Sequence, residues 1–187
     1  HPRLTPGSPE AAPHPATPAL PGRLRAPRAF SVAEPSAVAV PRPGQPMIAV
    51  ETPTTTDARG VDPVCTRDPQ CDLHDESLTA VLAEGGPTAL LIATPAYCQT
   101  AICGPVLDVM LSQQAAFPDV RMVHAEVYKD PEAVDNIADA TLAPVVDAYH
   151  LGYEPALFLA NSDGTIAVRL DTIFDESEVN EALAQLT

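Results

Sequence analysis

The sequence has little positive charge and no tryptophan: 10 lysines and arginines stand against 25 aspartates and glutamates, a net charge of −15. A chain this acidic repels nucleic acid and anionic lipid surfaces, so nucleic acid is excluded as a partner. No apolar run reaches the roughly 18 residues of a membrane-spanning helix. A Ser-His-Asp arrangement, a phosphate-binding glycine loop and a metalloprotease helix are also missing, and we predict no cofactor and no resident metal.

Proline is abundant instead, with 22 residues, 12 of which precede Met47. The N-terminal stretch lacks apolar periodicity and holds five basic but only two acidic residues. We predict a disordered, Pro-rich tether over residues 1–43 and one folded domain over residues 44–187. That domain then has 5 basic and 23 acidic residues, a net charge of −18. Because the chain begins at His1 rather than at a methionine, we expect a removed signal or anchor, and a membrane or cell-envelope partner for the tether.

Four cysteines fall as two close pairs, Cys65/Cys71 and Cys98/Cys103. An even number of cysteines behind a Pro-rich tether indicates an oxidising compartment, so we predict an extracytoplasmic location: secreted, periplasmic or anchored in the cell envelope. Cys65 and Cys71 lie in a turn-rich segment, which favours a structural disulfide that contributes about 2 kcal/mol. A four-cysteine zinc site is disfavoured, because both spacings exceed the usual C-x2–4-C.

The second pair follows an apolar run that ends in the Thr94-Pro95 turn. This pattern predicts a strand that delivers Cys98 to the start of a helix, where free N–H groups and the helix dipole favour a thiolate. We therefore predict Cys98 as the attacking thiol and Cys103, a turn or more inside the helix, as the resolving thiol. Residues five apart on a regular helix lie roughly 140° around and about 7.5 Å along it. A disulfide needs Cα atoms within roughly 7 Å, so Cys98 must precede the helix, or the first turn must open.

The remaining pattern predicts alternating strands and helices. Asn161-Ser-Asp-Gly164 marks a hairpin, and Asp175 and Glu178 mark a capping box. Residues 51–75 are predicted as loop and residues 128–138 as loop or loose helix. Strands are expected at 45–50, 89–93, 120–127, 156–160 and 165–170, and helices at 77–84, 98–117, 141–149 and 175–186.

This order of elements, with a cysteine after the first central strand and the segment Gly152-Tyr-Glu-Pro155-Ala-Leu-Phe-Leu-Ala-Asn-Ser-Asp-Gly164, resembles the thioredoxin fold. The resemblance covers residues 44–187 and implies an α/β domain, a mixed central sheet with helices on both faces. It further implies that Pro155 is a cis-proline facing the active cysteine, where backbone groups pair with an extended substrate. The long loop before the first helix looks more like extracytoplasmic, membrane-tethered relatives than like thioredoxin itself.

The resemblance also assigns neighbours to the thiol. Tyr97 stands in the place of the usual tryptophan, and with Glu154 and Pro155 it would contact substrate. Glu154 would place a negative charge near the thiol and raise its pKa. In place of Trp-Cys-x-x-Cys the chain has Cys98-x4-Cys103, which also resembles one branch of peroxiredoxins with its preceding Thr94-Pro95.

Three functions remain open at this point: a thiol–disulfide oxidoreductase acting on protein thiols or disulfides, a thiol peroxidase, and a non-enzymatic binding module stabilised by two disulfides. Copper held by Cys98, Cys103 and His150 is a further alternative. His150 is otherwise expected as an exposed residue at a helix end, and His124 as a satisfied core residue. Glu126 is expected as a surface carboxylate at the end of a strand.

Overall fold

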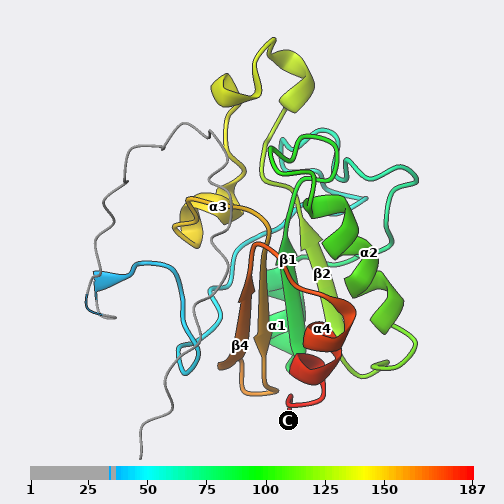
Figure 1. Cartoon of the computed structure of the whole chain (residues 1–187), viewed down its shortest axis with the longest axis vertical. Coiled ribbons are helices and arrows are strands. Elements are labelled where there is room, and N and C mark those ends of the chain that lie inside the picture. Colours follow the sequence, from blue (N-terminus) through cyan, green and yellow to red (C-terminus); the bar gives the residue numbers. More distant parts are fainter. Residues whose placement is uncertain (1–33, 35–36) are drawn as a thin grey trace, which may run out of the picture. The chain divides into compact units, whose positions relative to one another are not determined.

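Four strands form one mixed sheet in the order β2-β1-β3-β4 (Figure 1). The computed structural model describes residue 34 and residues 37–187, so most of the predicted tether lies outside the described residues. β1 (Thr88–Ile92) pairs in parallel with β2 (Arg121–Ala125) and antiparallel with β3 (Ala156–Ala160), which pairs antiparallel with β4 (Ile166–Asp171). This is the topology of the thioredoxin fold, so the predicted fold class is confirmed.

Helices cover both faces of the sheet because β1 alternates between two cores. Leu90 and Ile92 belong to the core covered by α1 (Leu78–Glu84) and α3 (Pro144–Ala148). Ala89 and Leu91 belong to the opposite core, covered by α2 (Cys103–Gln113) and α4 (Glu176–Leu183). Figure 1 shows α2 and α4 on the near side of the sheet and α1 behind it. No helix in the described part of the chain is long and apolar enough to span a bilayer.

The helix boundaries follow local capping chemistry. Ser77 caps α1 by accepting a hydrogen bond from the Ala80 N–H, and Gly85 ends the helix with a positive φ of 76°. The predicted capping box of Asp175 and Glu178 opens α4. α3 is shorter than predicted because Pro144 occupies its first turn, where a missing N–H costs nothing. The segment 128–138 contains two short 3₁₀ turns, η2 (Pro131–Ala133) and η3 (Ile137–Asp139).

The predicted strand at residues 45–50 was wrong. Only Pro46 forms a bridge, with Thr165, through the Met47 N–H bond to the Gly164 carbonyl and the Ile166 N–H bond to the Gln45 carbonyl. Met47 already lies opposite the hairpin turn at Gly164, so no strand remains for residues 48–50 to pair with. Residues just before the predicted boundary at Gly44 also contact the domain: Pro41 is buried, and its carbonyl accepts a hydrogen bond from Arg169 at 2.9 Å.

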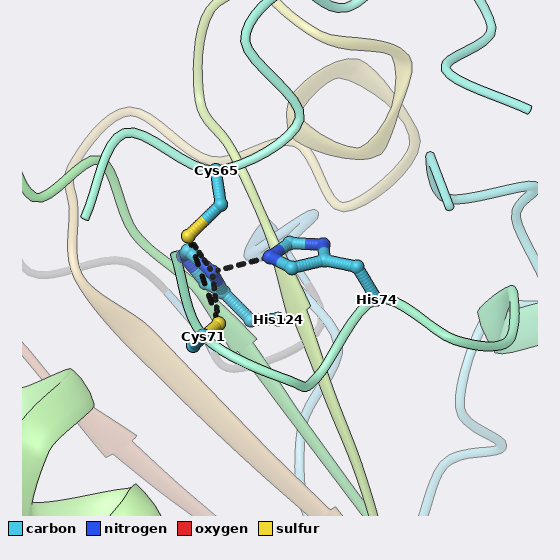
Figure 2. A group of neighbouring side chains, drawn as sticks. All are labelled: Cys65, Cys71, His74 and His124. Carbon is cyan, nitrogen blue, oxygen red and sulfur yellow. Dashed lines mark hydrogen bonds between the residues drawn. The ribbon is translucent and has the colours of Figure 1, made fainter. Parts of the chain in front are cut away.

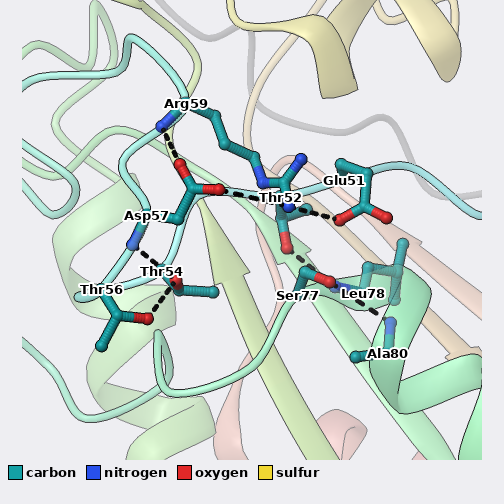
Figure 3. Close-up of polar contacts among 9 residues, drawn as sticks. All are labelled: Glu51, Thr52, Thr54, Thr56, Asp57, Arg59, Ser77, Leu78 and Ala80. Carbon is teal, nitrogen blue, oxygen red and sulfur yellow. Dashed lines mark hydrogen bonds and ion pairs between the residues drawn. The ribbon is translucent and has the colours of Figure 1, made fainter.

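Polar side chains attach the loop 51–75 to α1 (Figure 3). The buried Thr52 hydroxyl accepts a hydrogen bond from the Leu78 N–H at 2.8 Å. Arg59 forms ion pairs with Glu51 and Asp57, at 3.0 and 3.4 Å. These contacts give an otherwise irregular loop a defined path to Cys65 and Cys71.

A candidate dithiol site at the end of the sheet

The carboxyl end of β1 and the start of β3 lie at the same end of the sheet. Ile92 at the end of β1 pairs with Ala156 at the start of β3, and the parallel β2 ends beside Ile92 with Ala125. The chain leaves β1 through Thr94-Pro95 toward Cys98, and it enters β3 through Pro155. The topology therefore brings the predicted cysteine segment and the predicted proline to one edge.

Cys98 and Cys103 form a disulfide with Cα atoms 5.9 Å apart. Cys98 precedes α2, as the helix geometry required, in a turn where the Ala101 N–H donates to the Cys98 carbonyl. The prediction that Cys103 lies a turn or more inside the helix was wrong, because Cys103 is the first residue of α2. Ala101 adopts a positive φ of 57°, which keeps the segment between the cysteines out of a regular helix.

The two sulfurs differ in access. Cys98 is partly exposed, whereas Cys103 is fully buried against the core beneath α2. The Cys103 N–H donates a hydrogen bond to Cys98 Sγ at 3.3 Å, and the Thr100 hydroxyl lies 3.3 Å from the same sulfur. The N–H donor to Cys98 Sγ favours a thiolate on Cys98 once the disulfide is reduced. The N-terminus of the 11-residue α2 favours it as well.

Tyr97, Glu154 and Pro155 lie around this end of the sheet in three different settings. Tyr97 packs against the α1/α3 core, and its hydroxyl donates to Glu132 at 3.5 Å. Desolvation and the Glu132 charge raise the pKa of Tyr97. The Glu154–Pro155 peptide bond is cis, as the resemblance implied. Partial burial raises the pKa of the Glu154 carboxyl, which weakens its predicted effect as a fixed negative charge.

A mostly apolar cavity of about 170 Å³ lies beside the segment that leads to Pro155. Its lining combines the end of β1 with residues that follow β2 and α3, and among these are Ile92, Val127, Tyr128, Leu151, Tyr153 and Glu154. A cavity of this size and composition can accept an apolar side chain of an extended peptide.

Glu126 is not the surface carboxylate that we predicted: only 2% of it is exposed. The Thr66 N–H and hydroxyl both donate to its Oε1, at 2.6 and 2.9 Å, and its Oε2 has no partner among the described residues. Burial raises the pKa of this carboxyl. The Thr66 hydroxyl also accepts a hydrogen bond from the Ala96 N–H at 3.1 Å, so Glu126 is linked to the turn that carries Cys98.

The structure holds Cys65 and Cys71 as free thiols instead of the predicted structural disulfide, with Sγ atoms 3.6 Å apart. Both sulfurs face His124 Nδ1, at 3.8 and 3.5 Å, and His74 Nε2 lies 3.1 Å from that nitrogen (Figure 2). The hydrogen bond shared with Cys71 and those to the imidazoles lower the pKa of the Cys65 thiol. His124 is buried, as predicted, and bonded to the Ala93 carbonyl, but its other nitrogen belongs to this cluster.

The predicted copper set is not brought together. Within the described residues, the group of side chains placed to share an ion is Cys65, Cys71, His74 and His124, not Cys98, Cys103 and His150. His150 is exposed at the end of α3. The signal that the sequence did offer was His74, in C-x2-H spacing after Cys71, whereas His124 is distant along the chain and is brought in by β2.

No family model and no curated protein matches this chain. Solved structures with a similar fold include MTB DsbF, with 19% identity and a TM-score of 0.45 over 61% of this chain and 89% of that one. DsbE from Chlorobium tepidum has 13% identity and a TM-score of 0.48 over 76% and 99%. StoA from Bacillus subtilis has 20% identity and a TM-score of 0.40 over 52% and 81%. Likenesses at this level concern the fold alone.

Proposed function

We propose that this chain exchanges disulfides with protein thiols outside the cytoplasm through Cys98 and Cys103. The observation that carries the proposal is the asymmetry of the pair: Cys98 is partly exposed and its sulfur receives an N–H donor, whereas Cys103 is buried at the first residue of α2. An attacking thiol needs access and a lowered pKa, and a resolving thiol needs only to reach its partner.

In the oxidised protein, a substrate thiolate attacks Cys98 Sγ and the Cys98–Cys103 bond breaks. The bond's electron pair leaves with Cys103 as a thiolate, and a mixed disulfide joins the substrate to Cys98. A second substrate thiolate then attacks the substrate sulfur of that bond, which releases Cys98 as a thiolate. The substrate gains a disulfide, the protein becomes a dithiol once the two thiolates take up protons, and the reverse steps reduce a substrate disulfide.

The surroundings support binding of an extended protein substrate. The start of β3 at Pro155 and the cavity beside Glu154 lie at the dithiol end of the sheet. Backbone groups there could pair with a substrate strand while the cavity accepts a side chain. The predicted roles of Tyr97, Glu154 and Pro155 in substrate contact are part of this proposal.

The extracytoplasmic location is likewise part of the proposal. Disulfides such as Cys98–Cys103 persist in oxidising compartments and are rare where glutathione keeps thiols reduced. The Pro-rich segment 1–43 is proposed to link the domain to a membrane or cell-envelope partner.

The peroxidase alternative has less support. Thr94, which carried the resemblance to peroxiredoxins, is fully buried, and its hydroxyl has no hydrogen-bond partner among the described residues. It therefore does not assist Cys98.

Trapping tests the proposal directly. Cys103→Ser should accumulate a mixed disulfide when its Cys98 thiolate attacks a disulfide-bonded protein substrate, because no Cys103 thiol remains to release the substrate, and Cys98→Ser should not. A reduction potential above about −300 mV should accompany this result, because structural bridges lie below that value. No trapped complex together with a potential below about −300 mV would mean that the bridge only stabilises a binding module.

A further inference from the structure

We propose that Cys65, Cys71, His74 and His124 form a structural zinc site, separate from the dithiol (Figure 2). Their ligand atoms lie within 4.8 Å of one another. The four side chains are buried, with 3%, 8%, 2% and 0% of their surfaces exposed. Two thiols and two imidazoles are the donor set of closed, structural zinc sites.

Four of the six distances between the donor atoms match the edges of a tetrahedron around zinc. Zinc bonds of about 2.3 Å to sulfur and about 2.0–2.1 Å to nitrogen place ligand atoms roughly 3.8 Å apart for S–S, 3.5 Å for S–N and 3.3 Å for N–N. The observed Cys65–Cys71 separation is 3.6 Å. His124 Nδ1 lies 3.8 and 3.5 Å from the two sulfurs and 3.1 Å from His74 Nε2. The remaining two distances, from His74 Nε2 to the sulfurs, lie within 4.8 Å, so one zinc ion could bind all four atoms after a small shift of His74.

The second shell fixes one histidine in the ligating tautomer. His124 Nε2 lies 3.1 Å from the Ala93 carbonyl, which can only accept, so this nitrogen carries the proton. The lone pair is then on Nδ1, which faces both sulfurs and His74. An imidazole oriented by a backbone carbonyl is the usual arrangement of a metal-bound histidine.

The charge balance also favours a divalent ion. Two thiolates neutralise Zn²⁺, and two neutral imidazoles add no charge, so the buried site is neutral as a whole. A Cys65–Cys71 disulfide would use neither imidazole and would leave the two histidines only their mutual hydrogen bond, between His74 Nε2 and His124 Nδ1 at 3.1 Å. A shared ion would use all four donor atoms.

The site would hold the irregular loop before α1 against the sheet. Cys65, Cys71 and His74 come from this loop and His124 from β2. The next residue after Cys65 is Thr66, whose hydroxyl accepts from the Ala96 N–H in the dithiol turn. Zinc at this position would therefore stabilise the loop that supports Cys98, although the site does not depend on the proposed exchange reaction.

Zinc binding to the full chain tests the inference. The protein would be reduced with a phosphine, and zinc content and affinity would be measured by mass spectrometry and by competition with a chromophoric chelator. One zinc per chain is expected. Changes to second-shell residues lower metal affinity about 10–100-fold, and the ligand variants Cys71→Ser and His124→Ala should lower zinc affinity by more than this. The matched controls are the Cys98→Ser/Cys103→Ser double variant and His150→Ala. Their zinc affinity should be within about twofold of that of the unmodified chain, a much smaller change than the loss expected for a ligand variant.

Two measurements on the unmodified chain keep the test valid if a ligand variant does not fold. Cobalt should give the sulfur-to-metal absorption of a two-thiolate tetrahedral site. Zinc should protect Cys65 and Cys71, but not Cys98 and Cys103, from alkylation mapped by mass spectrometry. Zinc held by the Cys98/Cys103 pair, binding of copper(I) without zinc, no protection, or a Cys65–Cys71 disulfide in protein purified with zinc throughout would each overturn the assignment.

Discussion

The Cys103 N–H donates a hydrogen bond to Cys98 Sγ, so the buried cysteine stabilises its accessible partner through its backbone. This contact, at the N-terminus of α2, predicts that the reduced pair titrates unequally. The pKa of Cys98 should lie below the about 8.5 of a free cysteine. Limiting alkylating agent should therefore modify Cys98 before Cys103, as read by peptide mapping of the reduced protein. Equal rates at both thiols would contradict the assigned roles.

Glu126 predicts a pH dependence of stability. Its folded-state pKa is raised by burial, so the stability it contributes is fully present below its unfolded pKa of about 4.3 and is lost as the pH rises through the folded value. Glu126→Gln keeps an acceptor for Thr66 and should lose less stability than the unmodified chain over this rise in pH. Chemical denaturation across the range measures this, with the exposed Glu181→Gln as control. An unchanged pH profile in Glu126→Gln would show that this carboxyl does not titrate in the range.

Thr66 connects Glu126 to the dithiol turn, and its hydroxyl is the connecting group. Thr66→Val keeps the shape but removes the hydroxyl donor to the buried Glu126 Oε1, which should cost about 1–3 kcal/mol of unfolding free energy, and it leaves the exposed Ala96 N–H without this acceptor. Thr66→Ser keeps the hydroxyl and is the matched control. Amide exchange at Ala96 should become faster in the valine variant only. Similar stability of the two variants would show that solvent replaces the missing partner.

The sequence predicted the sheet and most helices because their signals are local: the buried strands β1 and β3 are continuous apolar runs, and α4 has its capping box. The prediction of a strand at 45–50 failed because apolar periodicity does not show where the partner strand begins, and β4 starts only after the hairpin turn at Gly164. The prediction that Glu126 is a surface carboxylate was wrong for a different reason. It does follow a strand, but its burial depends on a loop some sixty residues earlier, and no local pattern contains that contact.

The cysteine pairs show the same limit. Proximity along the chain suggested two similar disulfides, but in the structure Cys98 and Cys103 form a disulfide whereas Cys65 and Cys71 are free thiols. Cys98 and Cys103 are bonded to each other, and their difference in exposure follows from their positions before and at the start of α2. Cys65 and Cys71 meet His124, which β2 delivers through strand pairing with β1. The choice between a bridge and a metal site therefore depends on tertiary structure.

The N-terminal boundary of the domain gives a truncation prediction. The folded domain was predicted to begin at Gly44, but Val40 packs on the core and Pro41 accepts a hydrogen bond from Arg169. A chain starting at residue 37 should melt at nearly the temperature of the full chain. A chain starting at Gly44 should melt about 2–4 °C lower for each 1 kcal/mol lost at this contact. Equal melting temperatures for both truncations would restore the boundary at Gly44.

Reduction of Cys98–Cys103 should loosen the turn before α2 and leave the helix itself intact. The turn between the cysteines is held by the disulfide and by the Ala101 N–H bond to Cys98, whereas α2 is held by the buried Val106 and Leu107. Amide exchange should therefore accelerate at residues 99–102 on reduction, with little change at residues 106–110. The Cys98→Ser/Cys103→Ser double variant should resemble the reduced protein and should not respond to reductant. If exchange accelerated along all of α2, the bridge would be part of the support of the helix, and a static, stabilising role would explain it better than exchange.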